Sequence, residues 1–152
     1  MLVAMLVLSL AISFITGGAV SVKNAYQNVT LRSDAQLLLS TAITSVSDEL
    51  RYASDVTDDG STISFQSSTR KAKIKLENKD NNIYVVALKS DGTEAGEIPL
   101  ITDKTISNGL GIKIDSLKYE RDVFECILKI THNGTEDIYE GQTIYVRPVD
   151  AP

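Results

Sequence analysis

Several residue types are scarce in this 152-residue chain, and the scarcity of two of them bears on catalysis. The chain has one cysteine, Cys126, so no disulfide can form within it. The single histidine, His132, lies six residues further along the same predicted strand, which separates the two by about 20 Å. A catalytic thiol and its base must be about 3 Å apart, so this pair is not a nucleophilic dyad. No serine lies in a G-x-S-x-G motif. We therefore expect no enzyme and no cofactor.

The histidine and cysteine side chains that could bind a metal are equally few. One histidine and one cysteine cannot hold zinc without carboxylates. Two polar turns, Asp55–Asp59 and Asn78–Asn82, offer oxygen atoms, but the first lacks the ligand spacing of a calcium loop. Asn and Asp in both are already explained by turn chemistry. No metal site is expected, and calcium at either turn is left open.

Positive charge is in deficit, with 15 basic against 20 acidic residues and a net charge of −5. This balance disfavours a nucleic-acid-binding protein, which needs clustered positive charge. One segment departs from the average: KAKIKLE alternates, which places Lys71, Lys73 and Lys75 on one face of a strand. That face could bind DNA or another anionic surface, or it could simply keep a sheet surface or edge soluble.

No charged residue precedes Lys23, and helix-breaking residues are rare in the first third of the chain. The opening MLVAMLVLSLAISFITGGAVSV contains Gly17 and Gly18, the only glycines before Gly60, and the first proline is Pro99. Residues 2–53 are therefore predicted to form one helix about 80 Å long, loosened at Gly17–Gly18. Such a helix is longer than a small domain is wide, so we expect it to extend from one.

The two halves of this helix differ in pattern. Residues 1–22 are apolar on every side, which predicts burial in lipid or among other helices. Residues 23–54 are amphipathic, with a single apolar stripe expected to pack on a sheet and Glu49 outside it, facing solvent. The residues expected to make core contacts of the first half are Leu2, Leu6, Leu8, Leu10, Ile12 and Phe14. The helix–sheet contacts are expected at Leu39, Ile43, Val46 and Leu50.

Beyond Gly60 the apolar period becomes two, which predicts strands. The fold class is α+β, with the helix followed by a β-rich domain over 55–152 and one antiparallel sheet of about five to seven strands. DVTDDGS at 55–61 is expected to be a turn, and 83–89 a central strand. EIPLI contains Pro99 and suits an edge strand or a loop rather than a central strand, while 112–120 should carry a bulge at Asp115–Ser116. Cys126 is expected to be buried beside Phe124, Leu128 and Ile130.

Three interpretations of residues 1–22 remain open. A cleaved secretory signal would need a basic n-region, which the segment lacks. A plain membrane anchor fits its length, but Lys23 and Arg32 flank it on the domain side. The third possibility is a helix that first lies in the membrane and is later buried among copies of itself.

The run MLVAMLVLSLAISF, continued by an amphipathic helix ending SDELRYA and then by a β-rich domain, resembles the type IV pilin and pseudopilin family. It looks most like the pilin-like proteins of Gram-positive bacteria. The resemblance implies a short basic leader ending in Gly upstream of Met1, cut by a prepilin peptidase that exposes an N-terminus for methylation. A glutamate that pairs with a neighbouring subunit would also precede Met1.

The implied function is structural: a filament subunit held in the cell membrane by residues 1–22 and then assembled into a surface pilus or pseudopilus. The implied partners are copies of this chain, other pilin-like subunits, the prepilin peptidase, the assembly platform and membrane lipid. The alternative is a membrane-anchored or secreted β-rich binding domain that does not polymerise. Whether the subunit is a major pilin, a minor pilin or a pseudopilin for secretion or DNA uptake is left open. Nucleic acid is a possible partner only of a subunit that serves DNA uptake.

Overall fold

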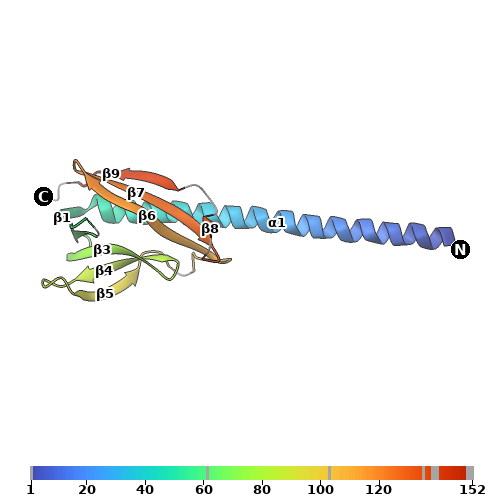
Figure 1. Cartoon of the computed structure of the whole chain (residues 1–152), viewed down its shortest axis with the longest axis horizontal. Coiled ribbons are helices and arrows are strands. Elements are labelled where there is room, and N and C mark those ends of the chain that lie inside the picture. The colour runs from blue at the N-terminus through green and yellow to red at the C-terminus, as the bar shows by residue number, and fades with distance from the viewer. Residues whose placement is uncertain (1, 61, 103, 135, 138–140, 150–152) are drawn as a thin grey trace. The chain divides into compact units, whose positions relative to one another are not determined.

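The computed structural model describes residues 2–60, 62–102, 104–134, 136–137 and 141–149, with the backbone alone described at Leu2, Glu136 and Asp137. Within these residues the chain is α+β, with one long helix followed by nine strands in two antiparallel sheets (Figure 1). The chain divides into two compact units, residues 1–34 and 35–152, which are described separately below.

Helix α1 (Leu2–Arg51) confirms the long helix predicted from the lack of proline. Its last part, from Ala35 onward, belongs to the second unit and supplies one face of that unit's core. The fully buried residues on this face are Ala35, Leu38, Ala42, Val46 and Leu50. Leu39 and Ile43, expected in the stripe, are only half-buried. The buried face of the helix is therefore centred nearer to Ala35 and Ala42 than predicted. The short side chains of these alanines let a sheet approach closely. The prediction missed them because it relied on large apolar residues.

Five strands form the first sheet in simple sequence order. They are β1 (Ala53–Asp58), β2 (Ile63–Ser67), β3 (Ala72–Lys79), β4 (Asn82–Leu88) and β5 (Glu94–Pro99). As predicted, β4 is an interior strand with Ile83, Val85 and Val86 buried. The strand β5, which ends at Pro99, is an edge strand, also as predicted, and all its residues are exposed.

The second sheet is built around β7. Its strands are β6 (Leu110–Glu120), β7 (Val123–His132), β8 (Glu136–Asp137) and β9 (Gln142–Val146). The pairing of β6 with β7 shifts between Ile114 and Ser116, which confirms the predicted bulge. Alternate residues of β7 point into the core, and Phe124, Cys126, Leu128 and Ile130 are at most 1% exposed.

Two expectations about the β-domain were wrong. One sheet of five to seven strands was expected, whereas the described residues form two sheets. The polar run expected to be a turn from Asp55 belongs mostly to β1, which pairs with β2 and shifts register between Ser54 and Thr57. Only Ala53 of this edge strand is buried, so its sequence lacks the alternating apolar pattern by which strands are recognised.

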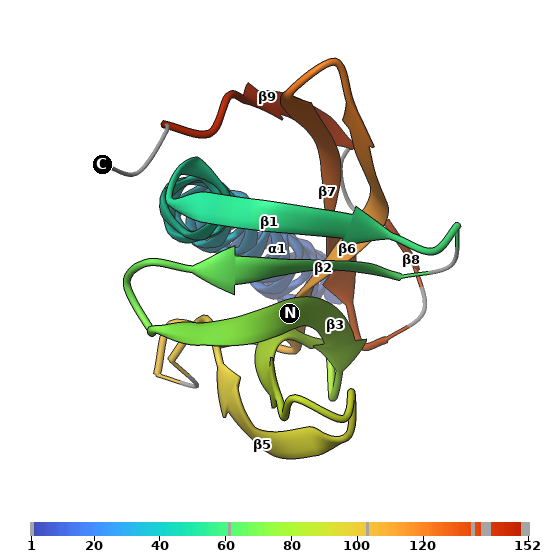
Figure 2. The same cartoon turned by 90° about the vertical axis from the view of Figure 1, so that its left-hand side faces the viewer.

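The two sheets lie on two sides of the α1 residues that belong to the second unit (Figures 1 and 2). The core between them is aromatic at its centre, where the rings of Phe65 and Phe124 meet edge to face with centroids 5.8 Å apart. Tyr119 packs on Phe124 from the second sheet. The sheets are also joined by hydrogen bonds between the β3–β4 hairpin and β6, since Asn78 exchanges two with the backbone of Ile114.

Candidate functional site

The surface of α1 over residues 3–22 is the largest apolar feature of the described chain. It carries no charged residue, and all its side chains are exposed. Among the residues singled out from the sequence, Leu6, Leu8, Ile12 and Phe14 are 57–77% exposed and Leu10 is 49% exposed. The side chain of Leu2 lies outside the described residues. An exposed apolar surface of this extent is unfavourable in water, so lipid or other protein must cover it.

Three of the four hydroxyl side chains within this surface are bonded inside the helix itself. The hydroxyl of Ser9 donates to the carbonyl oxygen of Leu6, that of Ser13 to Ser9, and that of Thr16 to Ile12, all at 2.8–2.9 Å. A hydroxyl bonded in this way can enter an apolar environment without leaving a donor unpaired. Residues 3–22 are therefore suited to burial at Ser9, Ser13 and Thr16 as well as at their apolar positions.

Small residues recur every fourth position along this surface, at Ser9, Ser13, Gly17 and Ser21. Residues four apart lie on the same helix face, so these four form one continuous strip. Such strips allow the backbones of two apolar helices to approach closely. The helix stays continuous through Gly17 and Gly18, and no atom lies within 4 Å of the position that a Cβ would occupy at either glycine. The local loosening expected at these glycines remains a prediction.

By length and composition α1 is able to cross a membrane, and its most apolar window is entirely exposed. A secretory signal near an N-terminus would pass the same test. The helix is therefore compatible with a membrane anchor or with a signal sequence.

The last turn of α1 holds a buried charge that the sequence pattern missed. Glu49 was expected to face solvent, but it is only 7% exposed. Its carboxylate accepts a hydrogen bond from Arg70 Nε at 2.8 Å and lies 2.7 Å from Arg70 Nη2. Ser67 Oγ also donates to it, at 3.4 Å. The pair ties the end of the helix to the β2–β3 turn, and no periodicity could reveal it because Arg70 is 21 residues away.

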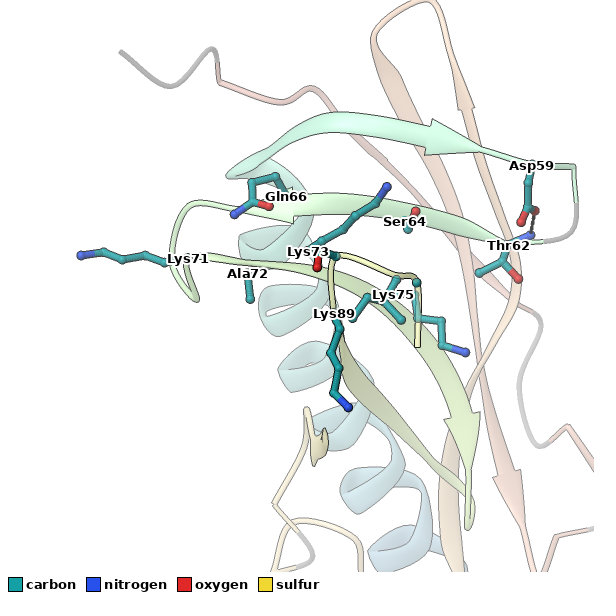
Figure 3. A pocket seen from close by; sticks show the side chains of 12 residues that line it. Asp59, Thr62, Ser64, Gln66, Lys71, Ala72, Lys73, Lys75 and Lys89 are labelled. Carbon is teal, nitrogen blue, oxygen red and sulfur yellow. Dashed lines mark hydrogen bonds between the residues drawn. The ribbon is translucent and has the colours of Figure 1, made fainter. Parts of the chain in front are cut away.

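A hollow of about 590 Å³ opens on the first sheet and is lined by Lys71, Lys73, Lys75 and Lys89 (Figure 3). Lys73 and Lys75 lie on β3 as expected from KAKIKLE, whereas Lys71 was expected on the same strand face and lies instead in the preceding turn, with φ 53°. Lys89 of the β4–β5 turn adds a fourth ammonium group. Lys75 forms ion pairs with Glu77 at 3.0 Å and Glu94 at 2.8 Å. The hydrogen bonds that the Lys75 ammonium group donates, first to Glu94 and then to Glu77, raise the pKa of Lys75.

The residues tested for catalysis and metal binding lie in ordinary structural roles. Cys126 is fully buried, and burial raises the pKa of its thiol to about 12, which makes the thiolate unfavourable. At the first turn considered for calcium, Asp58 and Asp59 accept hydrogen bonds from the backbone of Gly60 and Thr62. No cluster of three or more potential metal-binding side chains occurs among the described residues.

Comparison with protein-family models, with curated proteins and with solved structures finds no match for this chain. Its function is therefore inferred from the residues and their arrangement.

Proposed function

We propose that this chain is a structural subunit of a filament of the type IV pilus or pseudopilus kind. Before assembly the apolar half of α1 anchors the subunit in the membrane, and in the filament the same half is buried among copies of itself and related subunits. The β-domain faces solvent and needs no catalytic group for this role.

One observation carries the proposal: a single helix is apolar and exposed on all sides over residues 3–22, while its last turns form the core of a folded domain. The hydroxyl groups of Ser9, Ser13 and Thr16 support it, because each is bonded within the helix. The strip of small residues supports it further, since close helix–helix packing is required in a filament core but not in a lone anchor.

The experiment must separate helix packing from membrane insertion. The substitution Ser13→Leu enlarges the strip while making the helix more apolar, so membrane insertion is retained and close packing is blocked. Ala11→Leu is the matched control, because Ala11 is also a small residue of the apolar segment but lies on a different helix face. Cells producing each form are sheared, and the released material is examined for filaments by immunoelectron microscopy and for this chain by immunoblot.

We expect filaments from the unsubstituted chain and from Ala11→Leu, and membrane-bound subunit without filaments from Ser13→Leu. A chain found only as a membrane-bound monomer, in cells that contain the assembly machinery, would rule out the filament. That result would favour the second candidate, an anchored β-rich binding domain, which the length of the apolar helix equally allows.

A further inference from the structure

The lysine-lined hollow is bounded by strands of the first sheet and by the β4–β5 turn. The register places Gln66 opposite Lys73 and Ser64 opposite Lys75, so amide and hydroxyl groups lie beside the ammonium groups. The turn is held by Asp91, whose carboxylate accepts hydrogen bonds from the backbone and the hydroxyl of Thr93. The hollow is therefore bounded by ladder-paired strands and by a turn fixed by its own hydrogen bonds.

Three of the four lysines have no carboxylate partner among the described residues. Lys73 donates to the hydroxyl of Thr57, at 3.3 Å, and neither Lys71 nor Lys89 forms an ion pair with any residue that the structure describes. By contrast Lys75 is neutralised by Glu77 and Glu94, which do not line the hollow. The carboxylate that does line it, Asp59, accepts a hydrogen bond from the backbone amide of Thr62. Unpaired ammonium groups thus gather around one hollow of a chain whose net charge is −5.

The lysines do not converge on one point. Figure 3 shows Lys71, Lys73 and Lys89 pointing away from one another around the hollow. Lys71 lies in the turn before β3, Lys73 lies on β3 and Lys89 lies in the β4–β5 turn, so the three ammonium groups extend from three different places around the hollow. A single small anion cannot contact all three groups, whereas a linear polyanion can.

The uncharged part of the lining narrows the chemistry of the ligand. It consists of hydroxyl, amide, aliphatic and backbone groups, and none of the lining residues is aromatic. Nucleobases in single strands are commonly bound by stacking on aromatic rings, which this hollow does not provide. It also contains no arginine, the residue whose fork matches a carboxylate, and lysine binds phosphate as a point charge.

We propose that the hollow binds a linear polyol phosphate, that is, a polyanion whose phosphodiesters are joined by hydroxylated aliphatic units. Lys71, Lys73 and Lys89 bind successive phosphates, and Ser64 and Gln66 hydrogen bond to the hydroxyl groups between them. All these residues belong to the second unit, so the site does not depend on the assembly of α1 and stands or falls separately from the filament.

The test uses the full-length chain in nonionic detergent micelles and a poly(glycerol phosphate) of defined length, with binding measured by calorimetry at two salt concentrations. The variant is Lys71→Ala/Lys73→Ala/Lys89→Ala. Its control, Lys23→Ala/Lys104→Ala/Lys118→Ala, removes the same charge from lysines that do not line the hollow. Inorganic phosphate and an oligothymidylate with the same number of phosphates are titrated alongside, and thermal unfolding verifies that each variant is folded.

We expect poly(glycerol phosphate) to bind with an affinity that falls with salt and drops about tenfold in the hollow variant but less than about threefold in the control. Equal losses of affinity in the two variants would mean that the polymer is attracted by positive charge in general and not by this hollow, which would overturn the proposal. Tighter binding of oligothymidylate would overturn the assignment to a polyol, and equally tight binding of inorganic phosphate would overturn the assignment to a polymer. The proposal also fails if poly(glycerol phosphate) does not bind.

Discussion

The ion pair of Glu49 and Arg70 shows at the scale of single residues how one buried charge joins two distant segments. Glu49 has little access to water, whereas the side chain of Arg70 is 31% exposed. Removing the arginine leaves a buried carboxylate without its counter-charge, which is more costly than removing both groups.

We expect Arg70→Met to lower the free energy of unfolding by about 2–3 kcal/mol, less than the roughly 3–5 kcal/mol typical of a fully buried pair, because Arg70 is partly solvated. Glu49→Gln and the double variant complete a double-mutant cycle, measured by urea unfolding. The double variant should lose less than the sum of the single losses. Asp48→Asn, the exposed neighbouring carboxylate, is the control and should change stability by less than about 0.5 kcal/mol. Additive losses would mean that the pair is not coupled.

The burial of Cys126 makes the stability of the folded chain fall as the pH rises above 9. Burial raises the pKa of its thiol from the ordinary 9.0 to about 12. Above pH 9 the unfolded chain therefore loses this proton while the folded chain keeps it, so the thiol's contribution to stability is full below pH 9 and is lost as pH rises toward 12.

Between pH 8 and pH 10 the free energy of unfolding of the unsubstituted chain should fall about 1 kcal/mol further than that of Cys126→Ala. Both are measured by urea unfolding under reducing conditions, and all other titrating groups are shared between the two proteins. Parallel pH profiles would show that Cys126 does not titrate differently in the folded chain.

At the scale of the elements, neighbouring side chains of α1 differ sharply in their exposure to solvent. Leu37 is 63% exposed and its neighbour Leu38 is fully buried. Leu38→Ala should therefore cost about 3 kcal/mol by urea unfolding, while Leu37→Ala should cost less than about 0.5 kcal/mol. Similar losses at both positions would place the apolar face of the helix elsewhere.

The β3–β4 turn approaches β6 closely at Gly111. A Cβ added at Gly111 would lie 2.7 Å from Asn81 Cβ and from Thr131 Oγ1, and the amide of neighbouring Ile112 donates to the Asn81 carbonyl oxygen. Gly111→Ala should destabilise the domain by about 2 kcal/mol because these atoms must separate.

Gly96 of the edge strand β5 provides the control for this substitution, since no atom lies within 4 Å of the corresponding position there. Gly96→Ala should leave the thermal unfolding midpoint nearly unchanged. If Gly111→Ala is tolerated equally well, the two sheets are not in close contact at this junction.

The elements that the sequence predicted are those whose signal is local. Absence of proline predicted the helix, Pro99 predicted an edge strand, and the phase slip at Asp115–Ser116 predicted the bulge. The strand β1 and the division into two sheets escaped prediction because they depend on pairing between distant segments, and one buried residue in β1 gives no alternation. The lysines of the hollow were predicted in part: Lys73 and Lys75 share strand β3 and Lys71 lies in the turn just before it, whereas Lys89 is brought to them by the pairing of β3 with β4.

At the scale of the whole molecule, the second unit contains its own core, with α1 from Ala35 onward and both sheets. A chain starting at residue 35 should therefore be soluble and monomeric, with a cooperative thermal transition measured by circular dichroism. Removing only residues 1–22, the boundary indicated by composition, should also yield a soluble domain. An insoluble or unfolded product from both truncations would show that the apolar half of α1 is needed for folding.

The order of the strands has a consequence for the time the domain needs to fold. The first sheet is a meander of consecutive strands, and in the second sheet the exceptional neighbour is β9, which pairs with β7. Contacts between segments close in sequence require little loop closure, and proteins rich in them fold quickly. The part of α1 that belongs to the second unit is positioned against both sheets, and it precedes all the described strands in the chain. The slow step of folding is therefore expected to be the closure of the two sheets onto the helix rather than the formation of either sheet.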